Sequence, residues 1–165
     1  MSHRGRLRHL AILAAFLTLT AQAADLPQPF DASTPATLAR RYAGQPYILA
    51  FWSLQCGHCQ VELGSFARRL KARPGLPLVL VAAEVPELAP AVAARLAELG
   101  LQPAAQWAFA DAMPERVRFA VDRQWRGELP RTYLFDARHH AKVVTGVLDA
   151  SRLDQWLALN LPQLP

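Results

Sequence analysis

The chain of 165 residues contains two cysteines, and both lie in the segment Cys56-Gly57-His58-Cys59. A run of apolar residues, 48–52, precedes the segment, and an amphipathic stretch follows it. Two cysteines at this spacing, after a predicted strand and at the start of a predicted helix, are typical of a redox pair. Because the chain has no other cysteine, its disulfide chemistry takes place within this pair or with another protein.

The apolar patterns predict an α/β fold with a central β-sheet. Strands are predicted over residues 47–53, 78–83, 106–110, 132–135 and 142–148. Helices are predicted over residues 34–42, 56–70 and 92–99, from 114 to about 121, and from 151 onward. Strands that alternate with helices favour a sheet covered on both faces, and the final pair of strands makes that sheet mixed.

Two sequence signals predict how the outer helices of this domain begin. Ser33-Thr34-Pro35 is typical of an N-cap followed by a proline in the first turn. Ser151 and Asp154 match a capping box at the start of the last helix. The domain is therefore predicted over residues 34–165, preceded by a proline-containing lead-in segment at 24–33.

Residues 1–23 have the features of a cleavable secretory signal peptide. Arg4, Arg6 and Arg8 precede an apolar stretch, and residues 21–23 form an A-x-A cleavage pattern. The apolar stretch is shorter than the roughly 20 residues that span a bilayer, so we expect cleavage and export to the periplasm. The alternative is an uncleaved membrane anchor.

The charge balance gives little support for nucleic-acid binding. The chain has 18 basic and 13 acidic residues, and without the three arginines of the leader 15 basic residues remain, an excess of two. No basic stripe is interleaved with aromatic residues. We expect protein partners, exported and carrying thiols or disulfides, in a compartment where disulfides persist.

The predicted helix start gives the two cysteines different roles. Unpaired backbone N–H groups and the positive end of the helix dipole stabilise a thiolate at Cys56, which favours this residue as the exposed nucleophile. Cys59 begins the apolar face of the helix, so we expect it to be the protected, resolving thiol. Attack by Cys56 would form a mixed disulfide, and Cys59 would then release the partner.

Three neighbouring residues are candidates for supporting roles, each with a plainer alternative. Trp52 either shields the pair and contributes to a partner-binding surface or packs in the core. His58, as imidazolium, would favour the Cys56 thiolate and make the pair a stronger oxidant, or it faces solvent and tunes nothing. Glu62 either accepts the proton of Cys59 or is a solvated charge on the helix.

Metal binding is the alternative chemistry for the two cysteines. A closed zinc site needs four ligands, and only His139 and His140 are free to supply the other two. Adjacent histidines seldom bind one ion. Two thiolates and a histidine suit Cu(I), but a third well-placed soft ligand is missing from the sequence, so we expect no metal and no other cofactor.

Taken together, these residues resemble the thioredoxin superfamily, specifically the TlpA/ResA-like extracytoplasmic thiol-disulfide oxidoreductases. The matching features are Phe51-Trp52-x-x-x-Cys56-x-x-Cys59, Glu62, and Leu129-Pro130-x-Thr132 ahead of a strand. They extend from about Thr34 to the C-terminus. The resemblance implies a thioredoxin-like fold, with Glu62 near the buried cysteine.

The resemblance also implies how partners bind. It places a cis Pro130 opposite the redox pair and has the backbone of Leu129 contact an extended partner segment. From base rates alone, an X-Pro bond is expected to be trans. The implied function is the reduction of disulfides in exported proteins, as in cytochrome or copper-enzyme maturation, with a membrane electron donor that regenerates the enzyme.

Two departures from thioredoxin itself bear on this function. Ala50 stands where thioredoxin has a buried aspartate, so proton transfer is left to Glu62 or to water. Gly57 and His58 stand between the cysteines, as in protein disulfide isomerase, where thioredoxin has Gly-Pro. Because of the second departure, an oxidase or isomerase function remains an alternative to the reductase. A Cu(I)-binding module is the alternative that is not an enzyme.

Overall fold

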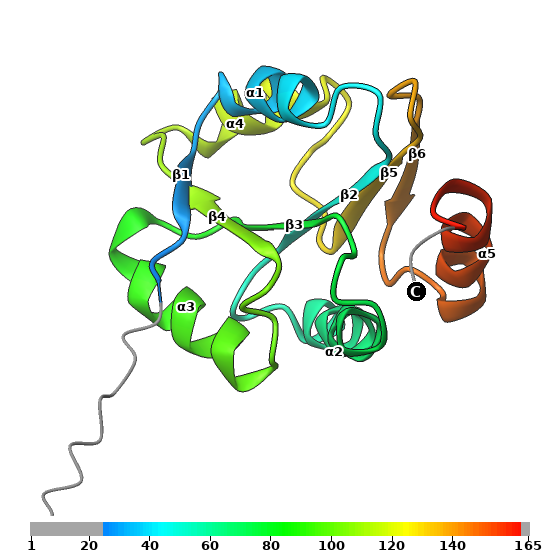
Figure 1. Ribbon diagram of the computed structural model, residues 1–165. Coiled ribbons are helices and arrows are strands. Elements are labelled where there is room, and N and C mark those ends of the chain that lie inside the picture. The colour runs from blue at the N-terminus through cyan, green and yellow to red at the C-terminus, as the bar shows by residue number, and fades with distance from the viewer. Residues whose placement is uncertain (1–24, 163–165) are drawn as a thin grey trace, which may run out of the picture.

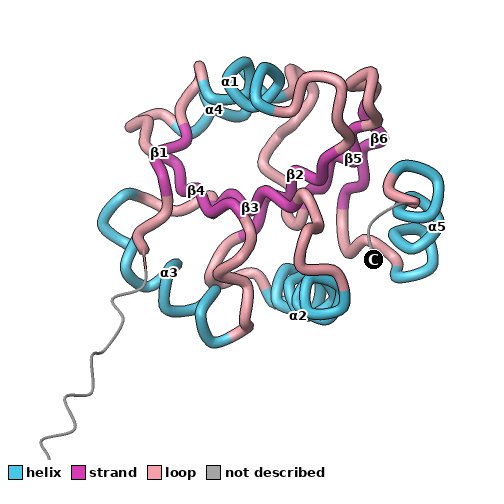
Figure 2. The backbone as a smooth tube through the Cα atoms, viewed as in Figure 1, coloured by secondary structure: helices cyan, strands magenta, loops and turns pink. Residues whose placement is uncertain are grey.

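The computed structural model describes residues 25–162, which form a six-stranded mixed sheet between two layers of helices (Figures 1 and 2). The strand order is β1-β4-β3-β2-β5-β6. The first four strands in this order are parallel to one another, and β5 is antiparallel to both of its neighbours. The strands are β1 (Gln28–Phe30), β2 (Tyr47–Trp52), β3 (Leu78–Ala82), β4 (Ala105–Phe109), β5 (Arg131–Phe135) and β6 (Ala141–Thr145).

Helices cover both faces of this sheet, which confirms the predicted fold class. Figure 2 shows α1 and α4 on one face and α2, α3 and α5 on the other. The helices are α1 (Thr34–Arg41), α2 (Gly57–Ala72), α3 (Ala89–Glu98), α4 (Pro114–Val121) and α5 (Ala150–Asn160), with a short 3-10 turn, η1 (Pro86–Leu88), before α3. None of the helices in the described part is both long and apolar enough to cross a membrane.

Strand β2 is the centre of the sheet, and all six of its residues are buried. An unbroken apolar run is expected of a strand with packed helices on both sides. β2 pairs in parallel with β3 and antiparallel with β5, where Phe51 lies opposite Arg131. This is the last pair of the register, so the end of β2 adjoins the start of β5, directly after Pro130.

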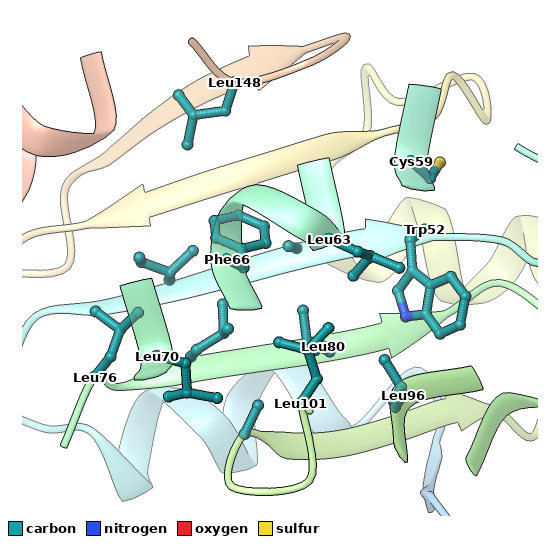
Figure 3. Packing of buried hydrophobic residues seen from close by; sticks show 14 of the residues in the cluster. Trp52, Cys59, Leu63, Phe66, Leu70, Leu76, Leu80, Leu96, Leu101 and Leu148 are labelled. Atoms are coloured by element: carbon teal, nitrogen blue, oxygen red, sulfur yellow. The ribbon is translucent and has the colours of Figure 1, made fainter. Parts of the chain in front are cut away.

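The sheet separates two hydrophobic clusters. Figure 3 shows the cluster under α2, in which Trp52, Cys59, Leu63, Phe66 and Leu80 lie among other buried side chains. On the opposite face, α1 and α4 cover an aromatic cluster built from rings of four strands and the loop before β5. Its buried aromatic members are Phe30, Tyr47, Phe51, Trp107, Phe109, Trp125 and Tyr133.

Strand β1 was not anticipated by the sequence analysis, which treated residues 24–33 as a lead-in. β1 pairs in parallel with β4 and completes that edge of the sheet, with Phe30 fully buried. The strand has three residues and contains Pro29. Proline is tolerated on an edge strand, where its missing N–H interrupts no central ladder.

The predicted start of α1 is confirmed, with Ser33 at the N-cap and a proline in the first turn, whereas the capping box predicted for α5 is wrong. At α1 the side chain of Ser33 makes no cap, because Asp31 Oδ1 accepts hydrogen bonds from the Ser33 and Thr34 amides at 2.8 and 3.1 Å. At α5 the cap is Asp149, whose Oδ1 accepts from the Ser151 amide at 2.8 Å. Asp154, the other half of the predicted capping box, is instead paired with an arginine of α2. In each case an aspartate two residues earlier supplies a stronger acceptor than the serine hydroxyl.

Candidate redox-active site

Cys56 and Cys59 are joined by a disulfide, with an S–S distance of 2.03 Å. Cys56 is the N-cap of α2, in an extended backbone conformation, and its Sγ accepts a hydrogen bond from the Cys59 amide at 3.1 Å. The pair therefore occupies the first turn of a 16-residue helix. The positive end of the helix dipole and the Cys59 amide are both directed at the Cys56 sulfur, an arrangement that stabilises a thiolate there.

The two sulfurs differ in burial. Cys59 is fully buried and Cys56 is half-buried. Figure 3 shows Cys59 and Trp52 at the same end of the core, above the end of β2. Trp52 is only 1% exposed, so its indole packs behind the pair and offers almost no area to a partner. Of the two interpretations given for Trp52, packing in the core describes its position.

Glu62 lies one turn of α2 beyond Cys59 and is 2% exposed. Its Oε1 accepts a hydrogen bond from the Leu148 amide at 2.8 Å, and its Oε2 accepts one from the Thr132 hydroxyl at 3.2 Å. Burial raises the pKa of Glu62 to about 7, against the opposing effect of these two hydrogen bonds. Glu62 is thus a buried group that can hold or release a proton near neutral pH, and the picture of a solvated helix charge is wrong.

Leu129 and Pro130 border the site from the neighbouring strand. The peptide bond between them is cis, which agrees with the resemblance and not with the base-rate expectation. Pro130 is buried and Leu129 half-buried, and both adjoin the chain that leads from β2 into Cys56. The Pro130 carbonyl accepts a hydrogen bond from the Gly146 amide at 2.9 Å, which ties the loop after β6 to the start of β5.

A buried arginine supports the segment that carries Leu129 and Pro130. Arg131 is 8% exposed, and its guanidinium donates to Asp122 Oδ2 and to the Tyr133 hydroxyl, both at 2.6 Å. A third hydrogen bond reaches the Thr145 hydroxyl at 3.0 Å. Hydrogen bonds from the Gln124 amide and from Arg131 hold the pKa of Asp122 below its ordinary value, although partial burial opposes them.

Sequence reasoning missed Arg131 because it stands at the unspecified position of Leu-Pro-x-Thr. The signal that could have found it is the alternation along β5. Arg131 and Tyr133 share one face of the strand, and Thr132 faces the other with Glu62.

Glu84 is a second residue that the sequence analysis missed. It follows β3, and its Oε1 accepts a hydrogen bond from the Leu54 amide at 2.6 Å. This bond holds the loop that connects β2 to Cys56. Its position was available from the sequence, because the carboxyl ends of adjacent parallel strands lie at the same edge of a sheet.

The histidines are not gathered around the cysteines. His58 is exposed in the first turn of α2. His139 lies in the turn between β5 and β6, where its ring contacts the Tyr42 carbonyl at 2.8 Å. That turn adjoins the start of β2, whereas the cysteines follow the end of β2. His139 and the cysteines therefore lie at opposite ends of this strand. Over residues 25–162, no group of three or more histidine, cysteine, aspartate or glutamate side chains is placed to hold a metal ion.

Solved structures with the same fold include several thiol-disulfide proteins. A thiol:disulfide interchange protein of the thioredoxin family from Chlorobium tepidum is 20% identical over 74% of this chain and 84% of its own, with a TM-score of 0.56. A secreted disulfide oxidoreductase from Mycobacterium tuberculosis is 17% identical over 73% and 85%, with a TM-score of 0.56. A secreted thiol-disulfide isomerase from Corynebacterium glutamicum is 18% identical over 74% and 72%, with a TM-score of 0.52.

These likenesses show that the chain has the thioredoxin fold, as its sequence resemblance implied. No protein-family model and no curated protein sequence matches the chain. Its chemistry is therefore argued from its own residues.

Proposed function

We propose that this protein is a thiol-disulfide oxidoreductase that reduces disulfides of exported proteins. The observation that carries the proposal is the unequal environment of Cys56 and Cys59, one half-buried at a helix N-terminus and the other fully buried behind it. A pair built for stability alone has no need of a thiolate-stabilising position for one of its sulfurs. The fold and the titles of its structural neighbours support the same chemistry.

The reaction begins with the reduced pair. The Cys56 thiolate attacks one sulfur of a partner disulfide, which forms a mixed disulfide and expels the other partner sulfur as a thiolate. The Cys59 thiolate then attacks Cys56 Sγ, which re-forms the Cys56–Cys59 disulfide and releases the partner's second thiolate. Two electrons pass to the partner, and two protons follow. A membrane electron donor is the proposed source of the electrons that reduce the pair again.

Glu62 is the proposed acceptor of the Cys59 proton. Cys59 is fully buried, so its thiol needs a base inside the protein before it can attack. With its pKa raised to about 7 by burial, Glu62 is matched to proton transfer near neutral pH. Thr132 and the Leu148 amide hold its carboxylate in place.

Leu129 and Pro130 are the proposed platform for the partner segment. The proposal is supported by their place directly before β5, which pairs with the strand leading to Cys56, and by the contacts of Arg131 and Gly146 that anchor them. An extended segment that pairs with the Leu129 backbone would bring its disulfide to the half-buried sulfur of Cys56. Trp52 has no part in this surface.

His58 supports a second candidate, a disulfide oxidase or isomerase. The residue is exposed in the first turn of α2, between the two cysteines. As imidazolium it would add to the stabilisation of the Cys56 thiolate, favour the reduced pair and so make the disulfide a stronger oxidant.

Export is proposed on the leader, residues 1–23, which lie outside the described residues. Two of the structural neighbours are described as secreted proteins. We propose that the leader is cleaved after residue 23 and that the protein acts in the periplasm.

Two measurements test the proposed function. The first is the reduction of a protein disulfide by the reduced enzyme, which Cys56→Ser is expected to abolish; activity near that of the wild type in this variant would refute it. The second is the reduction potential of the pair in glutathione buffers. A value near thioredoxin's, about −270 mV, supports a reductase, and one near about −120 mV supports an oxidase.

A further inference from the structure

A pocket of about 200 Å³ lies beside the segment that leads to Leu129 and Pro130. It opens between α4 and residues 122–126, on the face of the sheet opposite α2. Its walls combine arginine and aromatic side chains with one carboxylate. We call it the arginine pocket, and it is lined by Glu115, Arg118, Phe119, Arg123, Trp125 and Arg126.

The floor of the arginine pocket is rigid. Trp125 is 3% exposed, its ring centroid lies 4.6 Å from that of Phe51, and its Nε1 donates to the Glu128 carbonyl at 3.0 Å. The Arg131 guanidinium lies 6.0 Å from the same indole and is bound to Asp122. These contacts hold residues 122–128 against the sheet, so the pocket is formed before any partner arrives.

The charges of the pocket leave two arginines available. Arg118 is paired with Glu115 at 2.9 Å. The Arg123 guanidinium lies 5.3 Å from the centroid of the Phe119 ring. Within residues 25–162, neither Arg123 nor Arg126 has a carboxylate within the 4.0 Å of an ion pair.

Both carboxylates of the adjoining loop have other partners, and Asp122 is paired with Arg131 at 2.6 Å. Glu128 Oε2 accepts a hydrogen bond from the Arg126 amide at 3.1 Å and lies 4.0 Å from Arg131. Two guanidinium groups beside one pocket repel each other, and an anion between them relieves that repulsion. Guanidinium groups bind carboxylates through paired hydrogen bonds, and Phe119, 58% exposed, adds an apolar wall.

The arginine pocket borders the loop that leads to Leu129, the proposed docking point of a partner segment. Arg126 is three residues from Leu129, which is a separation of at most about 10 Å along an extended chain. Leu129 comes two residues before Arg131, which pairs with Phe51 near the end of the strand that leads to Cys56. A partner segment bound at Leu129 therefore carries residues past the pocket within about three or four positions of its reacting cysteine.

We propose that the arginine pocket binds an acidic side chain of the partner segment, close to the partner's reacting cysteine. This inference rests on the proposed function, because it assumes a partner that reacts at Cys56. The pocket makes the protein selective for disulfides flanked by aspartate or glutamate. Its effect is on partner affinity and on the rate of encounter, and the sulfur chemistry is unchanged.

The test uses disulfide-bonded peptides that differ at one position, three residues from the reacting cysteine, occupied by Glu, Gln or Lys. The reduced enzyme is assayed with each peptide at about 50 mM and about 500 mM salt. The test variant carries both Arg123→Gln and Arg126→Gln. The control variant is Arg152→Gln, which makes the same kind of substitution on α5, on the other face of the sheet.

We expect the wild type to reduce the Glu peptide about fivefold more efficiently than the Gln peptide at low salt, mainly through KM. A fivefold change corresponds to about 1 kcal/mol, which is the scale of an exposed ion pair. The Lys peptide should be reduced most slowly, and high salt should make the differences in efficiency between the three peptides smaller. The double variant should lose the preference while reducing the Gln peptide normally, and Arg152→Gln should keep the preference.

Equal efficiency with the Glu, Gln and Lys peptides in the wild type would overturn the inference and leave the proposed function standing. A preference that the double variant retains, or that Arg152→Gln also loses, would likewise overturn it. Failure to reduce any of the peptides would overturn the proposed function and the inference together. The comparison of peptides on the wild-type enzyme holds even if the double variant folds poorly.

Discussion

The buried carboxyl of Glu62 makes the stability of this protein depend on pH in a defined direction. Burial raises its pKa from 4.5 to about 7 in the folded protein. Between these two values the folded protein keeps a proton that the unfolded chain has lost. The contribution of Glu62 is therefore complete below about pH 4.5 and is lost as the pH rises to about 7.

The size of this effect follows from the shift. A difference of about 2.5 pKa units corresponds to roughly 3 kcal/mol, a large part of the stability of a domain of this size. The substitution Glu62→Gln removes the ionisation and keeps the shape. Its carbonyl can still accept from the Leu148 amide, and its amide can donate to Thr132. We expect its free energy of unfolding, relative to the wild type, to increase by about 3 kcal/mol between pH 4.5 and pH 8.

Urea denaturation of the oxidised protein, followed by tryptophan fluorescence, measures this difference at each pH. The carboxylates whose pKa values are lowered, such as Asp122, titrate in both proteins and cancel in the comparison. Glu98→Gln, at an exposed carboxylate on α3 paired with Arg95, is the matched control and should follow the wild type. Parallel stability curves for Glu62→Gln and the wild type across this range would refute the reasoning.

Three further predictions concern the site and the core. Thr132→Val removes a hydrogen bond that favours the Glu62 carboxylate, so the pH midpoint of Glu62, read from the pH dependence of disulfide exchange, should move upward; an unchanged midpoint would contradict this. Arg131→Met leaves Asp122 and Tyr133 without their partner, and chemical denaturation should show a loss of about 2–3 kcal/mol, with smaller losses counting against the network. Phe66→Ala empties a fully buried position under α2 and should cost about 3–5 kcal/mol by the same measurement, with a loss under 1 kcal/mol as the contrary result.

The main features of the fold could be predicted because strong local signals agree with it. The apolar run of β2 and the amphipathic face of α2 fix which residues face the sheet, and the cysteines stand between them. β1 could not be predicted in this way. It has three residues and one buried side chain, Phe30, and it is held as a strand only by pairing with β4.

The parts of the candidate site that depend on residues close in sequence could be predicted. The parts that depend on contacts between distant segments of the chain could not. The spacing of Cys56 and Cys59 determines their placement in one helical turn. The burial of Glu62 depends on Thr132, 70 residues away, and on the Leu148 amide, 86 residues away. Arg131 is buried with partners from two other segments of the chain, Asp122 after α4 and Thr145 at the end of β6, which no local pattern reveals.

In the proposed mechanism Cys56 is the attacking sulfur and Cys59 the resolving one. The most direct measurement is to trap the intermediate by mixing the Cys59→Ser and Cys56→Ser variants separately with a disulfide-containing peptide and analysing the products by mass spectrometry. We expect a stable mixed disulfide on Cys56 in the Cys59→Ser variant and little or none on Cys59 in the Cys56→Ser variant. Equal trapping by both variants, or faster trapping at Cys59, would contradict it.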